Sequence, residues 1–185
     1  SDIPLSAAAT LRNHSDSKVK ALAAKALPVH ETISRQAIVE RYQSALKLAG
    51  DKQRGKAVFT NSACFTCHQT PEGDGFAVGP DLATFKNAGS ESIIKNLFDP
   101  NAEVAPQYQA FAFTLINGES LSGIIAYEDT KDVTIRMVGG ADKTVSRKEV
   151  AGMKSLGQSL MPEGMESILT NQDVADLLSY ISTAE

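Results

Sequence analysis

The stretch Cys64-Phe65-Thr66-Cys67-His68 holds both cysteines of the chain and one of its three histidines within five consecutive positions. Residues this scarce rarely cluster by chance, so the segment predicts a chemical site. Because both cysteines lie in it, a structural disulfide elsewhere in the 185-residue chain is excluded.

The spacing of this segment is C-x-x-C-H, the attachment signature of c-type haem. Two thiols three residues apart can reach the two vinyl groups of one porphyrin and form thioethers. The adjoining imidazole then points at the iron, for which neutral imidazole is a standard axial ligand. The sequence therefore predicts one covalent haem c, with its iron, held by Cys64, Cys67 and His68.

Two other kinds of site use similar residues. A thioredoxin-like dithiol also has C-x-x-C, but it belongs to a βαβ context, whereas a helical pattern with Gly55 and Phe59 precedes this motif. A structural zinc site needs four ligands, and His14 and His30 lie upstream without the usual spacing. Haem is the preferred interpretation, and the other two stay open at this point.

A low-spin electron-transfer haem needs a second axial ligand, usually Met or His. Met161 is favoured because it lies in an irregular stretch before the last helix, where Pro162 stiffens the chain by fixing its own φ. Met165 is the close competitor, and a histidine or an open site is the remaining alternative. The candidates with weaker claims are Met137, Met153, His14 and His30.

Helical periodicity flanks a region of strand-like alternation. Apolar spacing predicts helices near residues 16–27, 34–49, 51–63, 90–98 and 170–182. The last of these begins with a capping box formed by Thr170 and Asp173. Between them, residues 107–147 alternate in polarity around Asn117-Gly118, a strong hairpin signal. This region predicts a small antiparallel meander of four strands.

Composition limits the class of protein. The formal net charge of −4 argues against a nucleic-acid partner, which would need a basic face. No apolar stretch reaches the ~18–20 residues that a membrane span requires. The chain opens at Ser1 without the basic start and apolar run of a signal peptide, so we expect a processed chain or a fragment of a longer one.

Several motifs together resemble class I cytochromes c: Gly55 and Phe59 before the cysteines, Gly79-Pro80-Asp81-Leu82 after them, a Met-Pro pair, and a closing Leu-x-x-Tyr-Ile. More narrowly, the chain is similar to a haem-binding domain abundant in Planctomycetes and Verrucomicrobia. The motifs of that domain found here are Asp99-Pro100-Asn101, Tyr108 before the strands, the Asn-Gly hairpin, S-L-M-P-E-G from Ser159 to Gly164, and D-L-L-x-Y from Asp176 to Tyr180.

The resemblance implies an α+β fold class: a mainly α-helical class I cytochrome c fold with a small antiparallel β-sheet inserted between the haem-attachment motif and the distal Met loop. The cytochrome c domain would span residues 51–185, with its β-insert at about 107–147. Residues 1–50 are similar to the end of a HEAT-type helical-repeat region. In this family the module is commonly C-terminal in long multidomain proteins.

Roles for individual residues also follow from the resemblance. Cys64 and Cys67 would be the thioether anchors, His68 the proximal ligand and Met161 the distal ligand. Pro80 is similar to the proline whose carbonyl accepts a hydrogen bond from the proximal histidine, which orients the ring. Phe59 matches a contact where the first and last helices cross. Apart from the resemblance, Leu82 is expected either in the wall of the haem pocket or in the ordinary core.

The preferred function is one-electron transfer by a non-enzymatic domain that accepts electrons from a redox partner or from a dehydrogenase domain of a parent polypeptide. A haem-based ligand-binding, peroxide-reactive or sensor domain with a labile distal site is the alternative. In a third hypothesis the β-insert binds carbohydrate or a partner, although aromatics alternating along strands more often form a core face. Because thioether attachment occurs outside the cytoplasmic membrane in bacteria, the resemblance implies a bacterial, periplasmic or otherwise exported protein.

Overall fold

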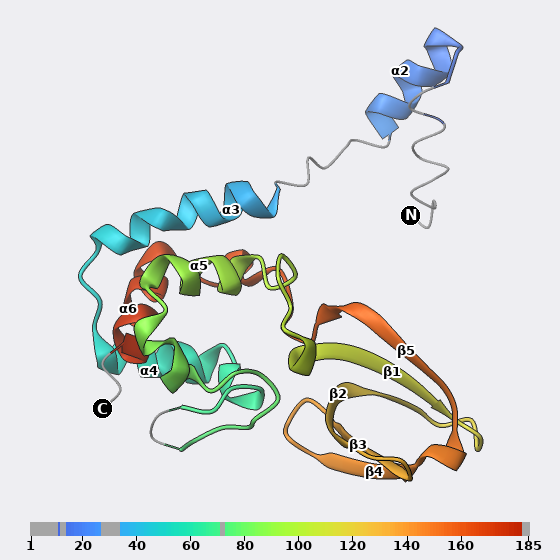
Figure 1. Ribbon diagram of the computed structural model, residues 1–185. Helices are drawn as coiled ribbons and strands as arrows, with labels where there is room; N and C mark the ends of the chain where they lie inside the picture. The colour runs from blue at the N-terminus through green and yellow to red at the C-terminus, as the bar shows by residue number, and fades with distance from the viewer. Residues whose placement is uncertain (1–10, 12–13, 27–33, 71–72, 183–185) are drawn as a thin grey trace. The chain divides into compact units, whose positions relative to one another are not determined.

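The computed structural model describes residues 11, 14–26, 34–70 and 73–182. The chain divides into two compact units, residues 1–34 and 35–185 (Figure 1). The first unit contains α2 (Ser17–Ala26), which begins where the carboxylate of Asp16 accepts a 2.8 Å hydrogen bond from the backbone N–H of Lys18. His30 lies outside the described residues, and His14 belongs to the first unit.

Helices form one half of the second unit. The α-helices are α3 (Arg35–Tyr42), α4 (Lys52–Asn61), α5 (Ser90–Phe98) and α6 (Asn171–Ser182). Short 3-10 helices are η1 (Gln43–Lys47), η2 (Cys64–Thr66), η3 (Leu82–Asn87), η4 (Pro106–Tyr108), η5 (Arg147–Glu149) and η6 (Met165–Ser167). The predicted capping box of α6 is confirmed, because Thr170 and Asp173 exchange hydrogen bonds between side chain and backbone.

The segment before α4 packs into the helical core. Ile38, Val39, Tyr42 and Ala45 are buried, and the Tyr42 ring stacks on Phe98 of α5 with centroids 3.9 Å apart. The sequence interpretation placed a domain boundary between residues 50 and 51, whereas the second compact unit begins at Arg35. Assignment of residues 1–50 to a helical-repeat region stays a prediction.

The crossing of α4 and α6 brings the chain near the cysteines against the last helix. A Cβ added at Gly55 would lie 2.0 Å from the backbone oxygen of Asp176, so only glycine fits there. Beside it, Asp176 accepts hydrogen bonds from Arg54 Nε at 2.7 Å and from the backbone N–H of Asp51 at 2.8 Å. These contacts fix the direction in which α4 delivers the chain to the cysteine motif.

An antiparallel sheet follows α5 and precedes α6 in the chain. Its strands are β1 (Gln109–Leu115), β2 (Ser120–Glu128), β3 (Asp132–Arg136), β4 (Asp142–Ser146) and β5 (Val150–Ser159), in the spatial order β4-β3-β2-β1-β5. The predicted antiparallel strands and the Asn117-Gly118 hairpin are confirmed, with Gly118 in the left-handed region at φ 86°.

The fifth strand corrects the four-strand prediction that ended near residue 147. β5 pairs with β1 through backbone hydrogen bonds while most of its side chains stay exposed. It therefore lacks the alternation of polarity by which a half-buried strand is recognised in a sequence.

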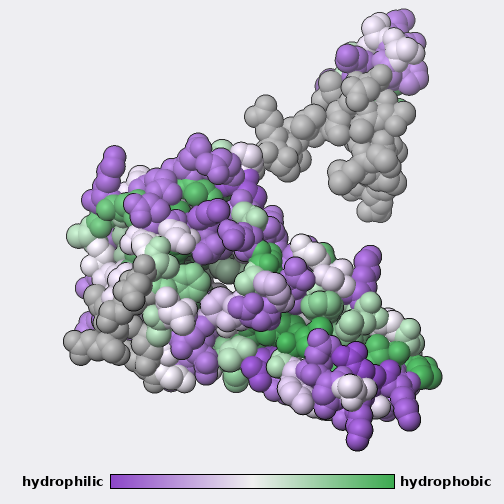
Figure 2. All heavy atoms as spheres, in the orientation of Figure 1, coloured by the Kyte–Doolittle hydropathy of each residue, from purple (hydrophilic) through white to green (hydrophobic). Residues whose placement is uncertain are grey.

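The sheet has its own core. It curls so that β1 and β5 lie above β2, β3 and β4 (Figure 1). Phe113 and Leu115 of β1 pack there with Val133, Ile135 and Val145. Phe113 is 1 % exposed and Tyr127 is 60 % exposed, so the aromatic residues of the sheet divide between core and surface. Figure 2 shows further hydrophobic side chains at the surface of the sheet, at lower right.

Hydrogen bonds join the β3–β4 turn to the segment that contains the cysteines. The backbone N–H of Gly139 donates to the carbonyl of Thr66 at 3.0 Å, and Arg136 donates to the carbonyl of Ala77 at 3.1 Å. A Cβ at Gly140 would collide with the ring of Phe76. The sheet therefore contacts the backbone on both sides of His68.

Candidate functional site

The cysteine motif forms a single turn at the end of α4. Ala63 adopts the left-handed conformation (φ 57°, ψ 24°), which ends the helix and redirects the chain into η2. The carbonyl of Cys64 then accepts hydrogen bonds from the backbone N–H groups of Cys67, at 3.1 Å, and His68, at 2.9 Å. Both thiols and the imidazole thus originate from one tight turn.

The ring of His68 is oriented by a backbone carbonyl. Its Nδ1 lies 2.8 Å from the oxygen of Pro80. A carbonyl can only accept, so Nδ1 carries the hydrogen and Nε2 keeps its lone pair. Burial lowers the pKa of His68 below its usual value, against an opposite effect of this hydrogen bond. The imidazole is therefore neutral near pH 7 and can bind a metal through Nε2.

The loop after the motif folds back to support that ring. The backbone N–H groups of Val78 and Gly79 both donate to the carbonyl of Cys67, at 3.0 Å and 2.7 Å. A Cβ at Gly79 would lie 2.6 Å from Cε1 of His68. Glycine at this position therefore makes the space that the imidazole occupies.

Cys64 and Cys67 form no disulfide in the part of the chain that the structure describes. Burial raises the pKa of Cys64 to about 11, so this sulfur is a neutral thiol at pH 7. A neutral thioether suits such an apolar position, because it carries no charge to desolvate. A reactive dithiol would instead need a lowered thiol pKa.

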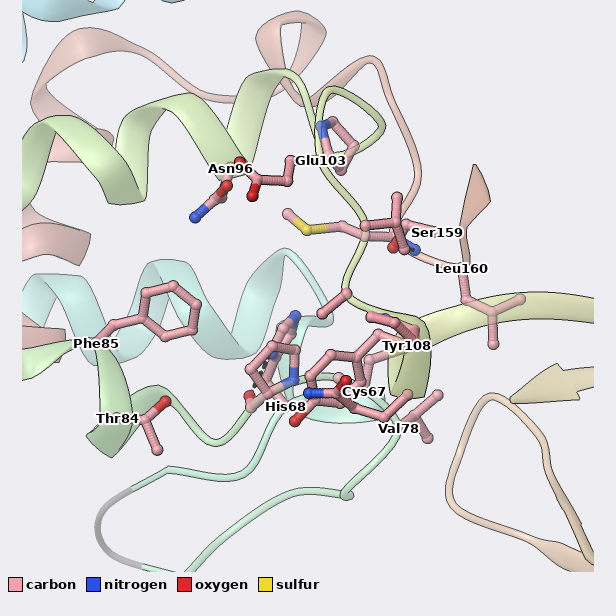
Figure 3. A pocket seen from close by; sticks show the side chains of 18 of the residues that line it. Cys67, His68, Val78, Thr84, Phe85, Asn96, Glu103, Tyr108, Ser159 and Leu160 are labelled. Atoms are coloured by element: carbon pink, nitrogen blue, oxygen red, sulfur yellow. Dashed lines mark hydrogen bonds between the residues drawn. The ribbon is translucent and has the colours of Figure 1, made fainter. Parts of the chain in front are cut away.

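Two adjoining cavities lie against the motif, with volumes of about 720 Å³ and 70 Å³. His68, Phe85, Asn96 and Met161 line both of them. Figure 3 shows Cys67 and His68 on one side of the larger cavity, with Asn96 and Glu103 on the opposite side. The void is thus bounded on different sides by the imidazole and by residues of α5 and the chain that follows it.

The seven residues predicted for the site meet around these cavities. Cys67, His68, Pro80 and Met161 line the larger cavity, and Phe59, Cys64, His68, Leu82 and Met161 line the smaller one. The residues present fit a covalently bound haem: a neutral imidazole with a free Nε2, two thiols on the same turn, an apolar recess and a thioether on its wall.

The methionines separate clearly. Of the four, which all fall within the described residues, only Met161 lines the two cavities. Met165 is 9 % exposed and packs in the helical core. Met153 lies on the exposed strand β5, and Met137 packs against the core of the sheet.

Sequence reasoning missed the polar part of the cavity wall. Lys95 and Asn96 of α5 and Glu103 after it line the larger cavity. One signal was available for Asn96, because it lies three residues after Ile93 and so interrupts the apolar face of that helix. Glu103 carries no comparable signal, since its loop has no periodic pattern.

One comparison with known proteins bears on this site. Residues 52–135 match the family model of cytochrome c. The match covers α4, the cysteine motif, Pro80 and α5, extends into β3 and ends before Met161. It spans somewhat less than half of the chain. No curated protein matches the chain.

The family match supports a cytochrome c-type, haem-binding electron-transfer domain that combines helices with a five-stranded antiparallel sheet. Cytochrome c domains carry covalent haem c, pass electrons to redox partners and are generally exported. Within the described residues, no helix has the length and apolar character needed to cross a membrane.

Proposed function

We propose that this domain binds one haem c through thioethers to Cys64 and Cys67 and transfers single electrons with His68 and Met161 as axial ligands. The observation that carries the proposal is that His68 and Met161 both line the same two cavities. When bound, the haem supplies reversible one-electron chemistry at its iron.

The residues of the chain hold the cofactor and tune it. The carbonyl of Pro80 keeps Nε2 of His68 available as a ligand. The apolar side chains of Phe59, Leu82 and Leu97 on the smaller cavity disfavour extra positive charge, and a His/Met ligand pair raises the reduction potential further. Such a site suits an electron acceptor for a dehydrogenase.

The partner is a redox protein or a dehydrogenase domain of a parent polypeptide, in a bacterial periplasm or another exported location. The proposal also treats the sheet as an insert in the cytochrome c domain, as the resemblance implies. It assigns the segment before the domain to a helical-repeat region. The alternative, a haem-based sensor or peroxide-reactive site, requires a distal position that opens easily.

Replacing the distal ligand tests the proposal. Purified haem-loaded protein should carry a mass increase of one haem. Its ferric spectrum should show the weak far-red charge-transfer band of a sulfur-ligated iron. Met161→Leu keeps the apolar volume but removes the sulfur, so we expect loss of that band, a lower reduction potential and CO binding at least tenfold faster.

Met165→Leu is the matched control, because this methionine packs in the helical core. It should keep the band and the slow CO reaction. Rapid CO binding by the unsubstituted protein would favour the sensor alternative. Colourless protein with the mass of the bare polypeptide would refute haem attachment altogether.

A further inference from the structure

The side chain of Asn101 bridges the chain on both sides of Met161. Its Oδ1 accepts a 2.9 Å hydrogen bond from the backbone N–H of Ser159. Its Nδ2 donates at 2.6 Å to Oε1 of Glu163. Ser159 lies two residues before Met161 and Glu163 two residues after it, so one carboxamide closes the ends of the short loop that carries the thioether.

A further hydrogen bond lies within the loop that Asn101 closes. The backbone N–H of Met161 donates to Oγ of Ser159 at 3.0 Å. Ser159 is also the last residue of β5, so one end of the loop is joined to the sheet. The position of Met161 is thus tied through Ser159 to Asn101.

Asn101 is itself held by the end of α5. It follows Pro100, which is buried and lines the larger cavity. The turn is closed by a 3.2 Å hydrogen bond from the backbone N–H of Ala102 to the carbonyl of Asp99. Because α5 also contributes Asn96 and Leu97 to the cavity walls, Asn101 joins the Met161 loop to a helix that borders the site.

A second contact holds the end of the loop and the turn that follows it, because Nε of Arg35 lies 3.7 Å from Oε2 of Glu163. Arg35 donates two hydrogen bonds to Glu166, at 2.5 Å and 3.1 Å, and a third to the carbonyl of Phe98 at 3.2 Å. The hydrogen bond between them raises the pKa of Arg35 and lowers the pKa of Glu166, so the pair stays charged at neutral pH. The loop is therefore attached to the end of α5 twice, by Asn101 and through Arg35.

We propose that Asn101 is the positioning residue for the distal ligand: it holds the Met161 thioether over the haem iron by bridging Ser159 and Glu163. This inference rests on the proposed function, in which Met161 is the distal ligand. A thioether is a neutral and weak ligand, so the time that it spends on iron depends on how rigidly its loop is held. A carboxamide suits this task because it offers both an acceptor and a donor.

The bridge also joins two of the sequence motifs. Asp99-Pro100-Asn101 and the Ser159 to Gly164 segment lie about sixty residues apart in the chain, and the sheet lies between them. Their direct contact gives a physical reason for both to be present: the first closes the loop formed by the second.

The test uses a swap of hydrogen-bonding roles in the haem-loaded full chain. Asn101→Asp keeps an acceptor for Ser159 but replaces the donor with a carboxylate that faces the carboxylate of Glu163. Adding Glu163→Gln to this variant restores an amide-to-carboxylate hydrogen bond with the roles reversed. The measurements are the rate of CO binding to the ferrous form, and the temperature at which the far-red band of the ferric form disappears, compared with global unfolding followed by circular dichroism.

We expect Asn101→Asp to bind CO about tenfold faster, which corresponds to about 1.4 kcal/mol and is the size expected for one hydrogen bond to a charged group. Its far-red band should disappear at a lower temperature while global unfolding shifts less. The double variant should return toward the unsubstituted protein.

Three results would overturn the inference: an unchanged CO rate in Asn101→Asp, a double variant that is not restored, or loss of the band only in step with global unfolding. The variant Met161→Leu distinguishes failure of the ligand assignment from failure of the positioning role of Asn101. A band that persists in Met161→Leu refutes the ligand assignment itself. A band lost in Met161→Leu but unaffected by the Asn101 substitution refutes the positioning role alone.

Discussion

Gly55→Ala tests how closely α4 and α6 cross. An ideal Cβ at Gly55 would lie 2.0 Å from the backbone oxygen of Asp176, 2.6 Å from its carbonyl carbon and 2.8 Å from Cβ of Tyr180. Ordinary van der Waals contact begins at 3.4 Å. Two of the three neighbours are helix backbone, which cannot rotate away. The helices must therefore separate by more than an ångström to accept a single methyl group.

The change in the free energy of unfolding caused by Gly55→Ala depends on two opposing contributions. Alanine is favoured over glycine in a helix interior by about 1 kcal/mol. Overpacking a core contact costs about 1–3 kcal/mol and occasionally more. Separation here also disturbs the ring contact between Phe59 and Tyr180, whose centroids are 5.7 Å apart, and the Arg54–Asp176 pair beside it. Together with these disturbed contacts, we expect a net loss of about 1–2 kcal/mol, or a fall in Tm of roughly 2–8 °C.

Thermal unfolding of the haem-loaded protein by far-ultraviolet circular dichroism measures this fall. Gly152→Ala in β5 is the matched control, because its Cβ would meet no described atom within 4 Å. That control should change the free energy of unfolding by less than about 0.5 kcal/mol. Equal melting temperatures for Gly55→Ala and Gly152→Ala would show that the two helices do not cross as closely as described.

Two further predictions concern the same helical half. The hydrogen bond from Arg54 lowers the pKa of Asp176 from 3.8 to about 2, so its contribution to stability is complete above pH 4 and is lost as the pH falls toward 2. Asp176→Asn should therefore lower the free energy of unfolding by about 1–2 kcal/mol at pH 7, a value that allows for the solvent exposure of Arg54. Urea titrations should show this difference shrinking below pH 4. A difference that stays constant with pH would contradict the lowered pKa of Asp176. Deletion of residues 1–34 should leave the melting temperature within about 2 °C, whereas deletion of residues 1–50 should cost several kcal/mol because four buried side chains of α3 and η1 are lost. Equal stability of the two shortened chains would place the boundary after residue 50.

The sequence predicted those features that depend on neighbouring residues. The C-x-x-C-H spacing, the capping box of α6 and the Asn117-Gly118 hairpin each operate within a few positions of the chain. Their geometry is a local property of the backbone, and for that reason the structure reproduces the box and the hairpin. The contact between Pro80 and His68 also joins residues that are close in sequence, because only twelve positions separate them.

Tertiary structure decided the features that depend on distant partners. β5 exists as a strand because the backbone of β1 pairs with it, although its side chains carry no strand pattern. The structure distinguishes Met161 from Met165, because Met161 lines the cavity and Met165 packs in the core. Only the path of the chain after the sheet determines which methionine takes which position. The bridge from Asn101 to the Met161 loop joins residues about sixty positions apart. Contacts between residues so far apart in sequence form only when the chain between them has folded, since no local preference brings the two partners together.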